Sequence, residues 1–254
     1  MSFVFNKHSV VNPMIPLIAA FQFLTIIPTI IRRPFTSQEM GRAVGWFPLV
    51  GLGLGALLYG VHYAATLIFP ATVSAALALL AWVFFTRAFH LDGLMDTCDG
   101  LYGGFTTERR LEIMRDSRMG AFGVVAGVII LLLKYTALAS SSDAGLALVM
   151  ATLFGRWTSS LVIVAFPYAR EQGVGYDMKK TARLPQALLA TTITVIASWL
   201  LNGTQGLLLI PITALAAIGI ALYIMRLLPG LTGDNYGTIT ELTETLVLLS
   251  FALA

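Results

Sequence analysis

Long apolar stretches alternate with short polar loops along nearly the whole chain. Crossing the hydrocarbon core of a bilayer takes about 20 apolar residues in a helix. The pattern therefore predicts an all-α fold, a polytopic bundle of membrane-spanning helices. The eight stretches that come close to the required length are residues 13–31, 43–62, 71–90, 119–140, 144–168, 185–202, 205–228 and 239–254.

The first stretch, residues 13–31, is the weakest candidate for a span. It contains Pro13, Pro16 and Pro28 together with the polar Gln22, and proline interrupts the regular hydrogen bonding of a helix. This stretch either spans, with the N-terminus outside, or is re-entrant or lies at the membrane interface, and we favour the non-spanning placement. The remaining stretches then predict about seven transmembrane helices.

Composition supports the same class of protein. Hydrophobic residues make up 57% of the 254 residues and charged residues only 11%, whereas soluble domains average about 25% charged residues. No linker or internal repeat divides the chain, so residues 1–254 are expected to form a single integral membrane domain. The net charge of +3 gives no reason to expect a nucleic-acid partner, and the lipid bilayer is the partner that composition implies. The lone Cys98 excludes an internal disulfide and a multi-cysteine metal site.

The basic residues indicate which face of the membrane carries the polar loops. If every stretch from the second onward spans, thirteen of the 16 lysines and arginines fall in loops on one side. The positive-inside rule makes that side cytoplasmic. The acidic stretch 91–118 and the Gly-Asp loop 229–238 fall on the same side, which favours one shared site that faces the cytoplasm.

The acidic residues are concentrated in a short part of the chain. Six of the 13 lie between positions 92 and 116, and Asp92, Asp96 and Asp99 are spaced so that a helix places them on one face. Carboxylates in such a row repel one another, so the spacing favours a bound cation over a solvated acidic loop. Magnesium binds a few carboxylates together with substrate phosphates and water. His90 precedes the cluster, either as a phosphate or metal contact or as a helix-end histidine satisfied at the interface.

A second charged stretch follows at residues 108–118. Glu108, Glu112 and Asp116 repeat every fourth residue, and four arginines interleave with them. Arginine makes bidentate contacts with phosphate oxygens, so acids for a metal and arginines for phosphate predict a diphosphate site. The alternative for Glu108 and Glu112 is a surface helix of mutual ion pairs. The residues of this stretch that we assign to the site are Arg115, Asp116, Ser117 and Arg118.

Three further places carry polar residues in apolar surroundings. Arg156 and Lys134 lie inside predicted spans, where a charge is a functional hypothesis by default; for Lys134 the alternative is to extend to the outer interface. Thr232 and Asp234 stand in the last polar loop, where a hydroxyl and a carboxylate suit a metal or a nucleotide. Glu241 begins the final helix, either as a favourable charge near its N-terminus or facing the same cavity.

These residues resemble the cobalamin synthase family, the adenosylcobinamide-GDP ribazoletransferases. The resemblance covers essentially the full length, and its aspartate-bearing motifs are highly specific. They are His90-Leu-Asp92-Gly93 with Asp96 and Asp99-Gly100, then Ile113-Met-Arg-Asp116-Ser117-Arg118-Met-Gly120-Ala-Phe-Gly123, then Thr232-Gly233-Asp234 with Gly237 and Glu241. Shorter matches are Phe23-Leu-Thr-Ile-Ile-Pro28, Phe47-Pro48, Gly155-Arg156 and Pro167-Tyr-Ala-Arg170.

The resemblance implies a magnesium-dependent phosphotransferase of the bacterial cytoplasmic (inner) membrane. Its substrates would be adenosylcobinamide-GDP and α-ribazole or α-ribazole 5'-phosphate; its products would be adenosylcobalamin, or the 5'-phosphate of it, and GMP. On this hypothesis Mg²⁺ binds Asp92, Asp96, Asp99 and Asp116, the catalytic carboxylates, and Asp116 or Asp99 accepts the hydroxyl proton. Contacts with phosphate or nucleotide are expected from His90, Arg115, Ser117, Arg118, Arg156, Arg170, Thr232, Asp234 and Glu241.

Two other classes share part of this pattern. CDP-alcohol phosphotransferases also combine spans with an aspartate cluster, but their motif continues Asp-Gly-x-x-Ala-Arg, whereas Asp99-Gly100 is followed here by Leu-Tyr-Gly-Gly. A cation-coupled transporter predicts charges spread through several spans, whereas the charges here gather on one face. The sequence leaves a homo-oligomer open as a further partner.

Overall fold

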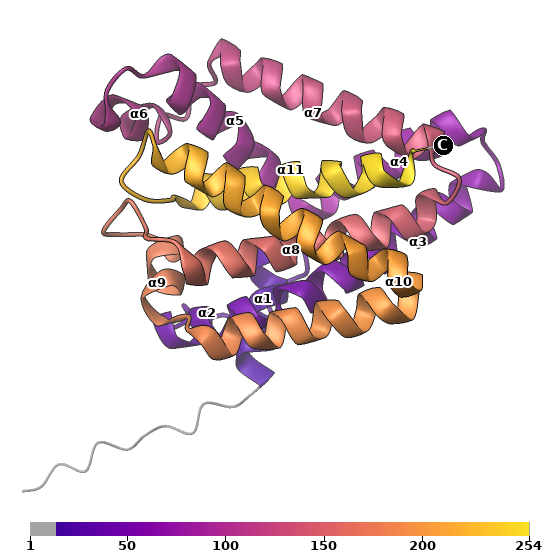
Figure 1. Cartoon of the computed structure of the whole chain (residues 1–254), viewed down its shortest axis with the longest axis horizontal. Helices are drawn as coiled ribbons and strands as arrows, with labels where there is room; N and C mark the ends of the chain where they lie inside the picture. The colour runs from indigo at the N-terminus through magenta and orange to yellow at the C-terminus, as the bar shows by residue number, and fades with distance from the viewer. Residues whose placement is uncertain (1–13, 254) are drawn as a thin grey trace, which may run out of the picture.

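The computed structural model describes residues 14–253, which Figure 1 shows as a bundle of helices. Apart from helices, these residues contain an isolated parallel bridge between Tyr168 and Leu231 and no strand. The predicted all-α bundle is confirmed. In chain order the elements are α1 (Met14–Leu24), α2 (Ser37–Ala43), η1 (Val44–Trp46), α3 (Phe47–Thr66), α4 (Ala71–Thr86), α5 (Phe89–Gly103), α6 (Thr107–Ile113), α7 (Ala121–Ser140), α8 (Ala144–Ala165), α9 (Val174–Thr181), α10 (Leu184–Met225) and α11 (Gly233–Phe251).

By length and apolar composition, four helices of the described chain are able to cross a membrane. These are α3 with the short helices before it (Ser37–Thr66), α7, α8 and α10. The pair α4 and α5 brings the number to five, but it is bent by 85°. The bend falls at Arg87 and Ala88, whose φ angles of 56° and 53° are positive, a conformation that costs a non-glycine residue about 1 kcal/mol or more. The bend turns α5 out of the direction of α4.

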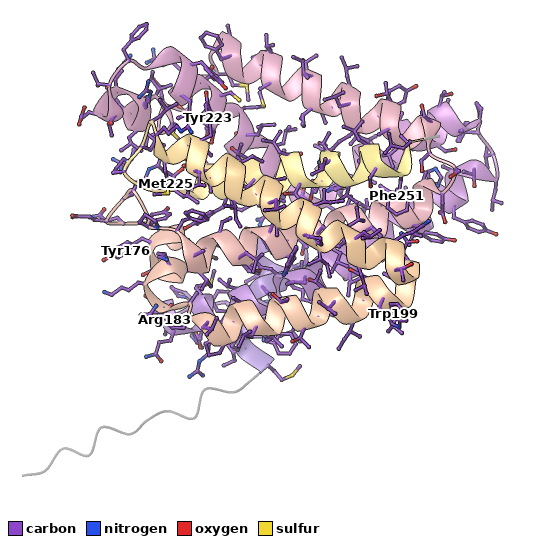
Figure 2. All side chains as sticks on the ribbon, in the orientation of Figure 1. Tyr176, Arg183, Trp199, Tyr223, Met225 and Phe251 are labelled. Atoms are coloured by element: carbon purple, nitrogen blue, oxygen red, sulfur yellow. The ribbon has the colours of Figure 1, made fainter. Side chains whose placement is uncertain are left out.

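α10 is continuous by its hydrogen bonds, but it consists of two helical arms that run in different directions. Its 42 residues would measure about 63 Å if straight, roughly twice the hydrocarbon thickness. At Gly203, with a φ of 54°, the backbone leaves the helical region, and the chain doubles back (Figure 1). Arg183 before α10 and Tyr223 near its end therefore lie at the same end of the molecule, with Trp199 at the other end (Figure 2). The two arms correspond to two of the predicted spans.

α11 is not among the helices that qualify as spans, since it carries three carboxylates, those of Asp234, Glu241 and Glu244. Most of its side chains are nonetheless buried, in contact with α5, α7, α8 and α10. The expected number of about seven spans is reached when the α4–α5 pair counts as one span, the two arms of α10 count separately, and the polar α11 is included. A charged helix inside a bundle needs neighbours that neutralise its charges.

α1 is too short to cross a bilayer. Its 11 residues measure about 16 Å, roughly half of the hydrocarbon core. Beyond it the chain turns back, because the Gln22 side chain accepts hydrogen bonds from the backbone N–H groups of Ile30 (3.0 Å) and Ile31 (2.8 Å). This geometry fits the expected non-spanning placement of the first apolar stretch, of which Pro13 lies outside the described residues.

α8 forms the centre of the bundle and contacts α3, α10 and α11. Gly51 and Gly55 of α3 allow the two helices to approach closely, since a Cβ on Gly55 would lie 2.6 Å from the Cα of Val149. Small residues serve this purpose in membrane helix pairs generally. The central position of α8 fixes where its C-terminal loop emerges, and that loop supplies Arg170 to the site described next.

Candidate active site

Glycines bring the two aspartate-bearing helices, α5 and α11, against each other. A Cβ on Gly93 of α5 would lie 2.8 Å from the carbonyl oxygen of Asp234, and one on Gly237 of α11 would lie 2.9 Å from that of His90. Two hydrogen bonds cross the same contact: Asn235 Nδ2 donates to Thr97 Oγ1 at 3.0 Å, and the Thr238 hydroxyl donates to the Gly93 carbonyl at 3.3 Å. Residues separated by about 140 positions in sequence are thereby held side by side.

Asp234 is fixed at the start of α11 by local capping. The Thr232 hydroxyl accepts from the backbone N–H of Asn235 (3.3 Å), while the Asn235 side chain accepts from that of Thr232 (2.8 Å). This is a reciprocal capping box with asparagine in the third helical position. The Thr232 hydroxyl also donates to Asp234 Oδ2 at 3.2 Å. Thr232 is fully buried, so in this structure it acts on the site by holding the Asp234 carboxylate.

Arg170 reaches Asp234 from the loop after α8. The backbone of this loop pairs with the segment before α11: Ala169 N–H donates to the Leu231 carbonyl at 2.8 Å, and Leu231 N–H to the Pro167 carbonyl at 2.9 Å. The Arg170 guanidinium then lies 3.0 Å from Asp234 Oδ2. One cation therefore already faces the carboxylates of this site.

The carboxylates of α5 and α11 form an electrostatic cluster at the end of the bundle, outside the predicted spans. Burial, followed by the negative charges of Asp92, Asp234 and Asp99, raises the pKa of Asp96 to about 7 against a smaller opposing effect of Arg170. Burial likewise raises the pKa of Asp234, and Arg170 lowers it. A raised carboxyl pKa means that the negative charge is poorly compensated. The cluster therefore suits an additional cation.

A cavity of ≈ 270 Å³ opens beside this cluster. Of the residues assigned to the site from sequence, His90, Asp92, Arg170 and Asp234 line it. The buried hydroxyl of Tyr236, 5% exposed, also belongs to the lining and has no hydrogen-bond partner among the described residues. Buried polar atoms are normally satisfied, so this hydroxyl marks a position for a bound group.

The Asp99 carboxylate is bound to the start of α7 and does not line the cavity. Its two carboxylate oxygens accept hydrogen bonds from the backbone N–H groups of Gly120 (2.7 Å) and Gly123 (2.8 Å). These are unsatisfied donors of the first turn of α7, so Asp99 caps that helix from outside it. Asp92, Asp96 and Asp99 do lie on one helix, α5, but the Asp99 side chain stabilises the start of α7.

Removing this cap is expected to destabilise the protein. Asp99→Ala leaves two N–H groups of α7 unpaired in a buried contact and should lower the free energy of unfolding by about 2 kcal/mol. Thermal unfolding in detergent measures the effect. Asp116→Ala, which removes a partly exposed carboxylate, is the matched control and should leave the melting temperature nearly unchanged. Equal melting temperatures for both variants would exclude the capping role.

Asp116 lies on the loop after α6 and is partly exposed. It pairs with Arg118, Nη2 to Oδ2 at 2.6 Å, and the hydrogen bonds from Arg118 lower the pKa of Asp116 to about 2. Arg115, Ser117 and Arg118 are exposed. None of these four residues lines the cavity. In the same stretch Glu112 pairs with Arg109 at 2.7 Å on the surface, which agrees with the alternative of mutual ion pairs.

The predicted four-carboxylate metal site is therefore not assembled. Among the described residues, no group of three or more His, Cys, Asp or Glu side chains is arranged to hold a metal ion. The physical reason is that Asp99 caps α7 and Asp116 pairs with Arg118, which leaves Asp92 and Asp96 of the four with Asp234.

Arg156 and Glu241 do not line the cavity either, because they belong to a buried network of charges. Lys134 Nζ lies 2.6 Å from Glu241 Oε2 and 2.5 Å from Glu244 Oε2, and Arg156 pairs with the other oxygen of Glu244. Lys134 also lies over the ring of Trp82, 4.3 Å from its centroid. Outward extension of Lys134 is wrong, since its side chain is only 3% exposed. In this structure Arg156 and Glu241 neutralise charges of neighbouring helices, and their assignment to substrate stays a prediction.

Fold and site together define a polytopic membrane protein whose helix bundle presents carboxylates and an arginine to a cavity at one end, an arrangement suited to phosphate chemistry. The model of the CobS family, cobalamin-5-phosphate synthase, matches residues 16–252. The chain belongs to this family.

Curated relatives match this chain over nearly their whole length. The chain is 36% identical to the adenosylcobinamide-GDP ribazoletransferase of Roseiflexus sp. (strain RS-1), over 96% of this chain and 91% of that protein. It is 40% identical to the protein of the same name from Stutzerimonas stutzeri (strain A1501), over 94% and 98%, and 39% identical to that from Desulforamulus reducens, over 92% and 94%. No solved structure is significantly similar to this chain.

Proposed function

We propose that this protein transfers the phosphocobinamide moiety of adenosylcobinamide-GDP to α-ribazole or α-ribazole 5'-phosphate and releases GMP. Family membership and the names of relatives at 36–40% identity support the proposal. The structural observation that carries it is the cavity lined by Asp92, Arg170 and Asp234. Neither rival class has comparable support, since no relative reported above is a CDP-alcohol phosphotransferase or a transporter.

The residues present fit Mg²⁺ as a cofactor. Magnesium is usually held by one or two carboxylates together with substrate phosphates and water rather than by a complete protein cage. Asp92 and Asp234 on the cavity would hold it, and the poorly compensated charge of Asp96 behind them favours a cation. When bound there, Mg²⁺ supplies charge neutralisation for a diphosphate.

The reaction requires an oxygen–phosphorus bond to form and another to break. The ribose 3'-hydroxyl of the acceptor attacks the phosphorus that carries the aminopropanol arm, and the bond from that phosphorus to the oxygen of GMP breaks. Arg170 is placed to contact the phosphate oxygens by exchanging its partner Asp234. The carboxylates beside the cavity, those of Asp92 and Asp234, are the candidates to accept the hydroxyl proton, because they are the acidic groups that line it. Asp99 and Asp116 contact the start of α7 and Arg118 in this structure, so we do not assign them that role.

We place the site on the cytoplasmic face of the bacterial inner membrane. The positive-inside rule supports this orientation, since Arg109, Arg110, Arg115 and Arg118 follow α5 directly. α6 and α9 lie at the same end of the bundle (Figure 1). Labelling of single cysteines at these loops in sealed inverted vesicles tests the orientation.

Removal of the metal is expected to abolish turnover. Purified protein in detergent, given adenosylcobinamide-GDP, α-ribazole and Mg²⁺, should release GMP, and excess EDTA should stop the release until Mg²⁺ is restored in excess. CDP-linked alcohols in place of the first substrate should give no CMP. Undiminished GMP release in EDTA would remove the metal from the proposal, and CMP release would favour the rival enzyme class.

A further inference from the structure

The cavity is lined by two chemically different groups of residues. Asp92, Arg170 and Asp234 form a charged group in its lining, in which Arg170 pairs with Asp234, and Phe23, Phe47 and Phe89 form an aromatic group whose rings contact one another. At ≈ 270 Å³ the cavity falls just below the range of about 300–1,000 Å³ typical of ligand sites. It therefore accommodates one moiety of modest size, with a charged end and an apolar end, and not a corrinoid ring.

Phe23, Phe47 and Phe89, which we call the aromatic wall, come from three separate segments. Phe23 comes from α1, Phe47 from α3 and Phe89 from α5. The Phe23 and Phe47 rings are stacked with centroids 6.5 Å apart and 20° between planes, and Phe89 meets Phe23 edge-on at 5.1 Å. Phe47 is buried, whereas Phe89 remains 41% exposed. α1 thus contributes Phe23 to the cavity.

Tyrosines close another part of the lining. The Tyr168 and Tyr236 rings lie 5.9 Å apart, and both line the cavity. The Tyr236 hydroxyl is the buried polar atom without a partner described above. Tyr236 and Asp234 line the same cavity, so a ligand bound there has an unused hydrogen-bond donor available.

We propose that the aromatic wall binds the flat, apolar base of the acceptor nucleoside, a benzimidazole, with its ribose directed toward Asp92 and Asp234. This inference rests on the proposed function. Aromatic side chains hold bases by stacking on their faces. A benzimidazole riboside has one free ring nitrogen, which accepts a hydrogen bond, and the Tyr236 hydroxyl is available to donate it.

The other base in the reaction, guanine, suits the wall poorly. It carries an amino group, an amide and further ring nitrogens, each of which costs free energy when buried without a partner. Phenylalanine side chains offer no hydrogen bonds. The aromatic wall therefore favours the acceptor over the guanosine of the donor substrate.

The test uses the purified full chain and α-ribazole as the probe. Phe89→Ala should weaken the binding of α-ribazole, so that its Kd rises about tenfold. Calorimetry without the second substrate measures this Kd. The KM for α-ribazole should rise by the same factor, with the KM for adenosylcobinamide-GDP unchanged. Phe89→Tyr should restore binding, and Tyr236→Phe should weaken it. Phe84→Ala, at a 60% exposed phenylalanine of α4 outside this cavity, is the matched control and should bind normally.

A rise in the KM for adenosylcobinamide-GDP alone would overturn the assignment in favour of guanine, and unchanged constants for both substrates would exclude the wall from binding either base. Because the calorimetric arm needs no turnover, it separates this inference from the proposed function. Phe89-dependent α-ribazole binding in a protein that releases no GMP would support the wall while contradicting the activity.

Discussion

Asp234→Asn should reduce the rate of GMP release by roughly 10³-fold, the size of effect seen when one preorganised charge-stabilising group is lost. The substitution keeps the shape of the side chain and its capacity to accept hydrogen bonds from Thr232 and Arg170. What it removes is the negative charge that faces the cavity beside Asp92. Turnover of purified protein at saturating Mg²⁺ measures the loss, and unchanged thermal unfolding would show that the fold is intact.

Asp143→Asn is the matched control for this substitution. Asp143 caps α8 by accepting from the backbone N–H of Leu146 at 2.9 Å, and asparagine caps helices as well as aspartate does. Its activity should equal that of the parent protein. If Asp234→Asn retained activity within a few-fold of this control, the α5–α11 cluster would not be the catalytic centre.

The architecture could be predicted from the sequence because each membrane-spanning helix is defined by its own run of apolar residues. Stretches of about 20 apolar residues define spans. Asp92 and Asp234, which lie outside the predicted apolar stretches or at their ends, were assigned to the site because carboxylates in these positions need a cation or a partner. The structure brings both to one cavity together with Arg170. The doubling back of α10 was also foreseeable, since Asn202-Gly203 interrupts an apolar run that is too long for one span.

The contacts of the remaining assigned residues could not be predicted from the sequence. Whether Asp99 meets a metal or the first turn of α7 depends on how α5 and α7 cross, and the spacing of acids along α5 does not contain that information. The same holds for Arg156, whose partner Glu244 is 88 residues away. The aromatic wall was missed because phenylalanine in an apolar segment has no local signature that distinguishes a cavity lining from lipid-facing or core positions.

Lys134→Met should lower the free energy of unfolding by about 3–5 kcal/mol, the typical result of removing one partner from a buried ion pair. The buried network is neutral as it stands, with two cations, Lys134 and Arg156, facing Glu241 and Glu244. Deleting one cation leaves an uncompensated carboxylate among helices, where the exposed fraction of the Glu244 side chain is 0%. Thermal unfolding in detergent measures the destabilisation, and Lys180→Met, on the exposed face of α9, is the control.

The double variant Lys134→Met with Glu241→Gln separates charge balance from packing. It restores neutrality, so it should recover a large part of the stability lost in the single variant, as expected when two partners of a buried pair are replaced together. Recovery of GMP release together with stability would mean that the network supports the site only by holding α7, α8 and α11 in place. Stability without recovered turnover would instead mean that Lys134 or Glu241 acts on the reaction itself.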